Sequence, residues 1–229
     1  MKKLRIVLGL CILTVGVVSA TTVSEQLTRC GVCGADVKIH KVMSTSSFGQ
    51  MDLDTRPAPM RRYLYSHRLG FCKACGYCSD NLSETITNAN VRAFLKTLDL
   101  GKMGKSLMLR YEVAAKLSEL QKMQAVKIFS YWQRAYWAAD DESDKAGIRR
   151  NRLKAADVLE EVCRNNFVDG DLLMLSDIYR VAGEFDKAEK TLIRLIKKDK
   201  LAELIEINAL YEMRLVKEKN SSVKQIVNK

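Results

Sequence analysis

The 229-residue chain is poor in proline and histidine. It contains only two of each, Pro57 and Pro59 and His40 and His67. Because proline interrupts helices, its absence outside residues 57–59 leaves most of the chain free to form them. No residue set in the chain supports nucleophilic or general acid–base catalysis. The remaining composition, 47% apolar and 28% charged residues, is typical of a soluble, mainly helical globular protein.

The chain also lacks an apolar run of full membrane-spanning length near its start. The candidate, residues 6–18, is shorter than the roughly 20 residues that span a bilayer. It follows three basic residues and precedes Val18-Ser19-Ala20. This arrangement is typical of a secretory signal peptide over residues 1–20, with cleavage before Thr21. We therefore expect an exported protein, periplasmic or extracellular; the alternative is an uncleaved N-terminal membrane anchor.

Acidic residues are too few to balance the basic ones, and the formal net charge is +11. Removal of the three basic residues in the signal peptide lowers it to +8. A basic surface attracts nucleic acid, anionic lipid or acidic polymers, and export argues against nucleic acid as the partner. Arg149, Arg150, Arg152 and Lys154 form a basic cluster without aromatic or base-reading neighbours, so we interpret it as a solvated helix face.

Cysteine is concentrated in two Cys-x-x-Cys pairs. Cys30 and Cys33 form the first pair, Cys72 and Cys75 form the second, and a glycine follows each. Two such pairs offer four thiolates to one tetrahedral Zn²⁺, and the glycine permits the tight turn that directs backbone N–H groups at the sulfurs. We predict a structural zinc site with these four ligands. Because four thiolates close the coordination sphere, the site has no open position for catalysis.

Other uses of the same thiols stay open at this point. An oxidising export compartment favours disulfides, and Cys-x-x-Cys is also the motif of thiol–disulfide exchange. Cys78 extends the second pair to Cys72-x-x-Cys75-x-x-Cys78, which adds an iron–sulfur cluster to the alternatives. Cys163 lies among apolar residues of a predicted helix and is expected to be a buried core thiol. The two histidines are expected to be ordinary strand residues.

Residues 21–82 are predicted to form a small β-containing module around the cysteines. Residues 37–42 alternate polar and apolar side chains, as a half-buried strand does. Residues 63–69 lead into the second cysteine pair and are expected to form another strand. Residues 21–27 are expected to be a short tether.

Two polar segments are predicted to be loops. In residues 44–59, Asp52 and Asp54 are expected to hydrogen-bond the loop backbone, the alternative being an acidic site against the zinc module. Residues 101–106, Gly-Lys-Met-Gly-Lys-Ser, lack the upstream glycine and the preceding strand of a phosphate-binding loop. We expect a simple loop there, followed by a helix that Ser106 caps.

Residues 83–219 repeat apolar side chains at helical spacing. The pattern predicts helices at residues 88–98, 106–123, 125–139, 143–165, 171–181, 186–197 and 200–217. Around Gly183 the apolar spacing matches a tetratricopeptide helix pair, with Ala188 small where two helices cross and Asp186 as a candidate N-cap. The predicted fold is mainly α, a tetratricopeptide-like helical array with a small β-containing zinc-knuckle module at its N-terminus. Residues 220–229 are expected to be a flexible tail.

Aromatic residues make up only 7% of the chain, and three of them lie close together in one predicted helix, residues 125–139. These are Trp132, Tyr136 and Trp137. We expect them to be core residues, with the alternative that one of them lines a groove.

The cysteine and helix motifs together resemble a bacterial family of unknown function whose chains combine Cys-Pro-x-Cys…Cys-Pro-x-Cys-Gly-Tyr with tetratricopeptide-like helices. The matching stretches are Cys30-Gly31-Val32-Cys33-Gly34, Asp52-Leu53-Asp54, Cys72-Lys73-Ala74-Cys75-Gly76-Tyr77, and residues 173–180 and 183–188. The resemblance covers nearly all of the mature chain and implies zinc and helical repeats, but no reaction. Gly31 and Lys73 replace the usual prolines, so we expect looser turns. Cys78 and the signal peptide are departures from the family.

The sequence therefore predicts an exported, non-catalytic protein-interaction scaffold with a structural Zn²⁺. A protein or peptide partner is expected on the concave face of the helices, with the zinc module capping or orienting the stack. One alternative is a thiol–disulfide or redox-sensing protein that uses the Cys-x-x-Cys motifs. The other is a zinc-ribbon nucleic-acid binder, which applies if the chain stays in the cytoplasm.

Overall fold

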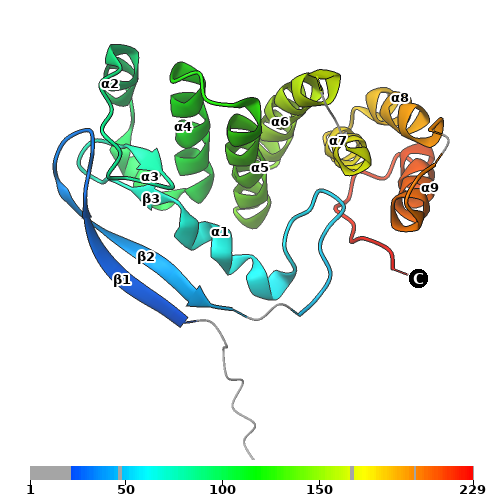
Figure 1. Ribbon diagram of the computed structural model, residues 1–229, viewed down its shortest axis with the longest axis horizontal. Helices are drawn as coiled ribbons and strands as arrows, with labels where there is room; N and C mark the ends of the chain where they lie inside the picture. Colours follow the sequence, from blue (N-terminus) through cyan, green and yellow to red (C-terminus); the bar gives the residue numbers. More distant parts are fainter. Residues whose placement is uncertain (1–21, 46–47, 166–167, 199, 229) are drawn as a thin grey trace, which may run out of the picture.

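The computed structural model describes residues 22–45, 48–165, 168–198 and 200–228, and the expected signal peptide lies outside these ranges. The described part is mainly helical, with a small β-hairpin near its N-terminus (Figure 1). This confirms the coarse fold class. None of its helices is both long and apolar enough to cross a membrane.

A two-stranded ribbon carries the first cysteine pair in the turn between its strands. Strand β1 (Thr22–Arg29) pairs antiparallel with β2 (Asp36–Ser44), and the ribbon extends to one side of the helices (Figure 1). The prediction of a strand at residues 37–42 is confirmed, whereas the tether expected at residues 21–27 is wrong. The segment forms a strand because β2 supplies its backbone hydrogen bonds. The residue pattern of the segment alone gives no sign of this pairing.

A much shorter hairpin, β3 (Gly70–Phe71) and β4 (Cys78–Ser79), carries the second cysteine pair. The strand expected at residues 63–69 is wrong, because a short helix, α1 (Tyr63–Arg68), follows the 3₁₀ turn Pro59–Arg61. Its Tyr65 is buried against Trp137, with ring centroids 5.8 Å apart. Packing on one side of the helix thus overrides the strand-like composition of the segment.

Eight further helices complete the described part. They are α2 (Ala89–Leu95), α3 (Leu100–Lys105), α4 (Leu107–Leu120), α5 (Ala125–Asp141), α6 (Lys145–Asn165), α7 (Asp169–Val181), α8 (Phe185–Ile196) and α9 (Glu203–Lys217). The seven predicted helices are all present, with small shifts at their ends. Helix α3 corrects the loop expected at residues 101–106, since Asp99 caps it through the backbone N–H of Lys102. Ser106 caps α4 as predicted.

Helices α4 to α9 stand side by side in a curved row (Figure 1). Gly183 has φ +82 in the turn between α7 and α8, and Ala188 is fully buried, as expected where two helices cross closely. Asp186 lies in the first turn of α8, and Glu184 rather than Asp186 occupies the N-cap position. The turn therefore depends on the glycine, which adopts a left-handed conformation without strain.

The chain covers the inner side of this row with its own loop. Residues 48–58 run along α5 and α7, together with α1 (Figure 1). Gln133 donates to the carbonyl oxygen of Asp54 at 3.0 Å, and the indole N–H of Trp137 donates to the Asp54 carboxylate at 3.2 Å. The predicted loop is present, but its centre is buried rather than solvated.

The C-terminal segment also packs on the inner side. The N–H of Ile226 donates to the carbonyl oxygen of Met51 at 3.0 Å, and that of Leu53 donates to Lys224 at 2.8 Å. Asn208 of α9 exchanges two hydrogen bonds with the backbone of Val227, at 3.0 and 2.8 Å. The expectation of a flexible tail did not anticipate these contacts, which join the C-terminal segment to residues 51–53 and to α9.

One continuous hydrophobic cluster runs from the cysteine hairpins to α9. It contains Cys72 and Tyr77 at one end and Ala209 and Val216 at the other. Trp132, Tyr136 and Trp137 are buried within it, which confirms the prediction that these aromatic side chains belong to the core.

Candidate metal centre

The four cysteines of the two Cys-x-x-Cys pairs meet at one point. Their sulfurs all lie within 4.8 Å of one another. Across the two pairs, the Sγ atoms of Cys30 and Cys75 are 3.7 Å apart, and those of Cys33 and Cys72 are 3.6 Å apart. A tetrahedron with Zn–S bonds of about 2.3 Å has sulfur–sulfur edges of about 3.8 Å. The donor set and its spacing therefore fit a tetrahedral metal ion.

Two equivalent turns position the sulfurs. In the first, the N–H of Gly34 donates to the carbonyl oxygen of Cys30 at 2.8 Å, and in the second the N–H of Gly76 donates to that of Cys72 at 2.8 Å. Gly34 and Gly76 have φ +75 and +78, which a side chain would strain. The predicted role of the glycines is confirmed, because each one lets the chain reverse around its pair of sulfurs.

The environment of the thiols explains why an ion would stabilise them. Burial raises the pKa of Cys72 and of Cys75, and backbone N–H groups in the turn offset this only in part. Burial also acts on Cys33, but hydrogen bonds from the backbone of Ala35 and from the neighbouring thiols lower its pKa. Four adjacent thiolates repel one another, and a bound dication removes that repulsion.

The first turn is fixed to the rest of the fold through Gly31. Its N–H donates to the carbonyl oxygen of Leu82 at 2.7 Å, and a Cβ at this position would overlap the carbonyl oxygen of Glu84. Proline, which the resembling family has here, carries no N–H and could not make this bond. Glycine at this position lets the turn pack against residues 82–86.

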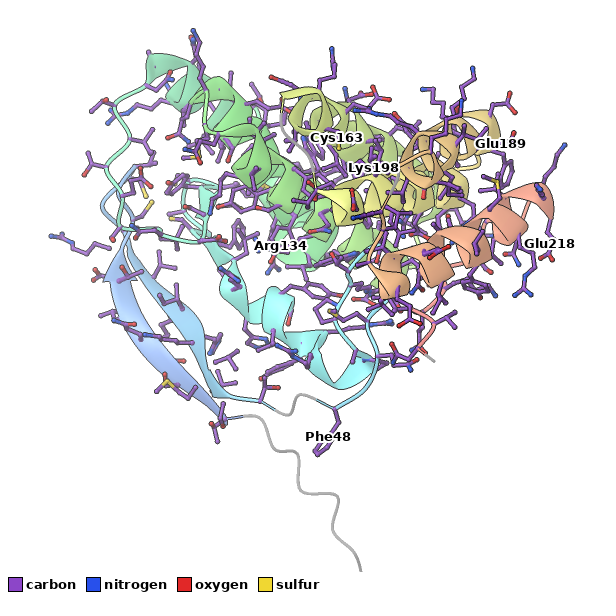
Figure 2. All side chains as sticks on the ribbon, turned by 45° about the vertical axis from the view of Figure 1, so that its right-hand side comes forward. Phe48, Arg134, Cys163, Glu189, Lys198 and Glu218 are labelled. Atoms are coloured by element: carbon purple, nitrogen blue, oxygen red, sulfur yellow. The ribbon has the colours of Figure 1, made fainter. Side chains whose placement is uncertain are left out.

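The other chemically reactive side chains lie outside the sulfur cluster. Cys78 is buried, and its thiol faces the carbonyl oxygen of Gly76 at 3.4 Å. Cys163 is buried on α6, among the helices and away from the hairpins (Figure 2), as predicted for a core thiol. His40 lies on β2 as expected, whereas His67 lies on α1, and the two rings are 5.8 Å apart. None of the described cysteines forms a disulfide.

The described partners of Asp52 and Asp54 are residues of the loop, of α5 and of α6, together with Arg62, rather than residues of the cysteine hairpins. Asp54 accepts from the backbone N–H of Arg56 at 3.0 Å, which confirms the expected hydrogen bonding within the loop. It also pairs with Arg152 of α6 at 3.2 Å, and both side chains are fully buried. Interpreting Arg152 as part of a solvated helix face was therefore wrong. The sequence carried no signal for this pairing, because its partners are about 100 residues apart.

Comparison with known proteins supplies no relative. The chain matches no protein-family model, no curated protein and no solved structure. The resemblance to the bacterial family with two cysteine turns is thus supported by the four-cysteine cluster alone, and membership of that family stays a prediction.

Proposed function

We propose that the chain is an exported, non-catalytic scaffold for protein interactions, built on a tetratricopeptide-like row of helices and stabilised by a structural Zn²⁺. The observation that carries the proposal is the convergence of Cys30, Cys33, Cys72 and Cys75 from two equivalent turns. Four thiolates leave a metal no vacant position, so the ion would hold the hairpins together and bind no substrate. When bound, it would supply folding free energy.

Two further features support a scaffold. The helix pair α7–α8 has the glycine turn and the small crossing residue of a tetratricopeptide unit, at Gly183 and Ala188. The N-terminal pattern of residues 1–20 supports export. Because the loop and the C-terminal segment cover the inner side of the row, a partner would bind on its other faces.

Metal analysis of natively purified protein tests this proposal. Native mass spectrometry is expected to report one zinc per chain and a mature N-terminus at Thr21. The variant Cys72→Ser should lose the metal and part of its stability, whereas Cys78→Ala, a matched change at a buried thiol outside the cluster, should keep it. Metal-free protein with two disulfides would support the redox alternative and overturn the proposal.

One observation favours the nucleic-acid alternative. A groove of about 930 Å³ lies between β2, α1 and the second hairpin. Its lining includes Lys41, Arg68, Lys73 and Arg110, so an extended polyanion would meet several positive charges there. Binding of single-stranded or duplex oligonucleotides that weakens steeply with added salt would support this function. Absence of binding at low salt would contradict it.

A further inference from the structure

A second cavity is more apolar than the basic groove beside β2. It has a volume of about 430 Å³ and lies between the α2–α3 segment, α4 and α6. Phe94, Leu98 and Met103 form one wall, and Leu109 and Val113 of α4 lie beside Trp132 of α5. This volume and apolar lining fall in the range of small-molecule sites.

One end of the cavity is lined by basic side chains of the helices that border it. Near the start of α4 and α6, Glu112 and Arg150 form an ion pair at 2.6 Å. One turn further along both helices, Lys116 and Lys154 line the cavity. Lys116 pairs with Glu119 at 2.6 Å, and Lys154 makes no ion pair with any residue that the structure describes. Because Glu119 already neutralises Lys116, Lys154 is the residue of this turn whose charge would attract an anionic group.

The lining also indicates what kind of molecule fits. It contains apolar and charged side chains and no hydroxyl or amide side chain. One turn of α-helix about 10 Å across occupies roughly 400 Å³, so the cavity has room for little more than a single turn of a partner helix. An apolar chain with one anionic end matches the volume, the apolar lining and the charge of Lys154.

We propose that this cavity binds a free long-chain carboxylate, with the hydrocarbon along Val113, Trp132 and Leu98 and the carboxylate at Lys154. The site is independent of the partner-binding role proposed above. It does adjoin the candidate metal centre, because Leu98 and Met103 lie against Gly76 in the second cysteine turn. The wall that they form is thus held in place by that turn, and the binding experiment uses the metal-loaded full chain.

Calorimetric titration with octanoate, decanoate and dodecanoate, each below its micelle concentration, tests the proposal. One molecule should bind per chain, and each added methylene should tighten Kd by roughly three- to fourfold, as its burial predicts. Dodecanoate should also change the fluorescence of Trp132. Dodecylammonium, which has the same chain and the opposite charge, should bind at least about tenfold more weakly.

Two variants locate the site. Lys154→Glu should weaken dodecanoate binding by roughly five- to tenfold, whereas Lys145→Glu, the same exposed charge change on the same helix outside the cavity, should alter it less than about twofold. Leu109→Gln should weaken binding while metal content stays at one per chain. Equal binding of dodecylammonium, no effect of Lys154→Glu, or binding of an acidic peptide in place of the carboxylates would overturn the proposal. Any of these results could coexist with one zinc per chain, so the scaffold proposal is tested separately.

Discussion

At the scale of single residues, three arginines carry their charge into the interior of the helical row. Arg152 lies between Asp54 and Asp140, at 3.2 Å from each. Arg180 of α7 pairs with Glu212 of α9 at 2.7 Å. The third is Arg56, which donates to the carbonyl oxygen of Trp137 at 3.2 Å. Removal of one of these arginines would leave its buried carboxylates without a positive partner, which costs about 3–5 kcal/mol.

Arg180 is shared by two buried carboxylates, those of Asp177 and Glu212. Burial raises the pKa of Asp177 to about 6 and that of Glu212 to about 8, because one guanidinium does not compensate two desolvated negative charges. Both values exceed those of the unfolded chain, so the folded state binds more protons. The free energy of unfolding should therefore fall as pH rises from about 5 to 8.

The variant Glu212→Gln tests this linkage. The variant should remove much of the fall in the free energy of unfolding between pH 5 and pH 8. For a single group with this pKa shift, that fall is on the order of 3 kcal/mol. Denaturant unfolding of both proteins at pH 5 and pH 8 measures the difference, with metal content held equal. The comparison between variants cancels the opposing effect of acid on a thiolate–metal site. A loss of equal size in both proteins would show that Glu212 is ionised throughout.

At the scale of elements, the two cysteine hairpins are similar in their turns but differ in how they attach to the fold. Gly31 in the first turn packs directly against the backbone of residues 82–86. Lys73, at the corresponding position of the second turn, is exposed. The sulfurs therefore have equivalent geometry, while only the first turn requires glycine at its second position.

This difference predicts that alanine at the second position of each turn changes the free energy of unfolding by unequal amounts. Gly31→Ala should lower the free energy of unfolding by on the order of 2–3 kcal/mol, because the added Cβ forces the turn away from Glu84. Lys73→Ala should change it by less than about 0.5 kcal/mol. Thermal unfolding of the metal-loaded proteins measures both. If the two variants were equally stable, packing of the first turn on residues 82–86 would not contribute.

At the scale of the whole molecule, segments distant in sequence close the inner side of the helical row. The loop near Asp54 contacts α5, α6 and α7, and the C-terminal segment pairs with residues 51–53. The carbonyl oxygen of Ser222 also accepts from Arg180 at 2.8 Å. The surface on which we expected a partner peptide is thus occupied by the chain itself.

Truncation after Asn220 tests whether the C-terminal segment holds the loop in place. It removes the acceptors and donors that Leu53, Arg180 and Asn208 use, and should lower the free energy of unfolding by on the order of 2–4 kcal/mol. Amide hydrogen exchange in residues 51–58 should become faster. Truncation after Val227 keeps those partners and serves as the control. Unchanged exchange in the shorter protein would show that the C-terminal segment does not hold the loop.

The sequence by itself determined the features that depend on residues close to one another in the chain. Helical periodicity located seven helices, Ser106 marked a cap, and Gly183 marked a turn, because each depends on residues within a few positions of one another. The spacing of the cysteine pairs identified four residues that the fold brings together. It left the occupant of that cluster open, since a thiol pair looks the same in a zinc site and in a disulfide.

Only the tertiary structure decided the features whose partners are distant in the chain. Residues 22–29 became a strand through β2, Tyr63–Arg68 a helix through packing at Tyr65, and Arg152 a buried ion through Asp54. The position of the loop on the inner side of the row and the cavity at Lys154 arise in the same way. In each case the deciding free energy comes from burial and pairing with partners up to about 100 residues away, which no local pattern records.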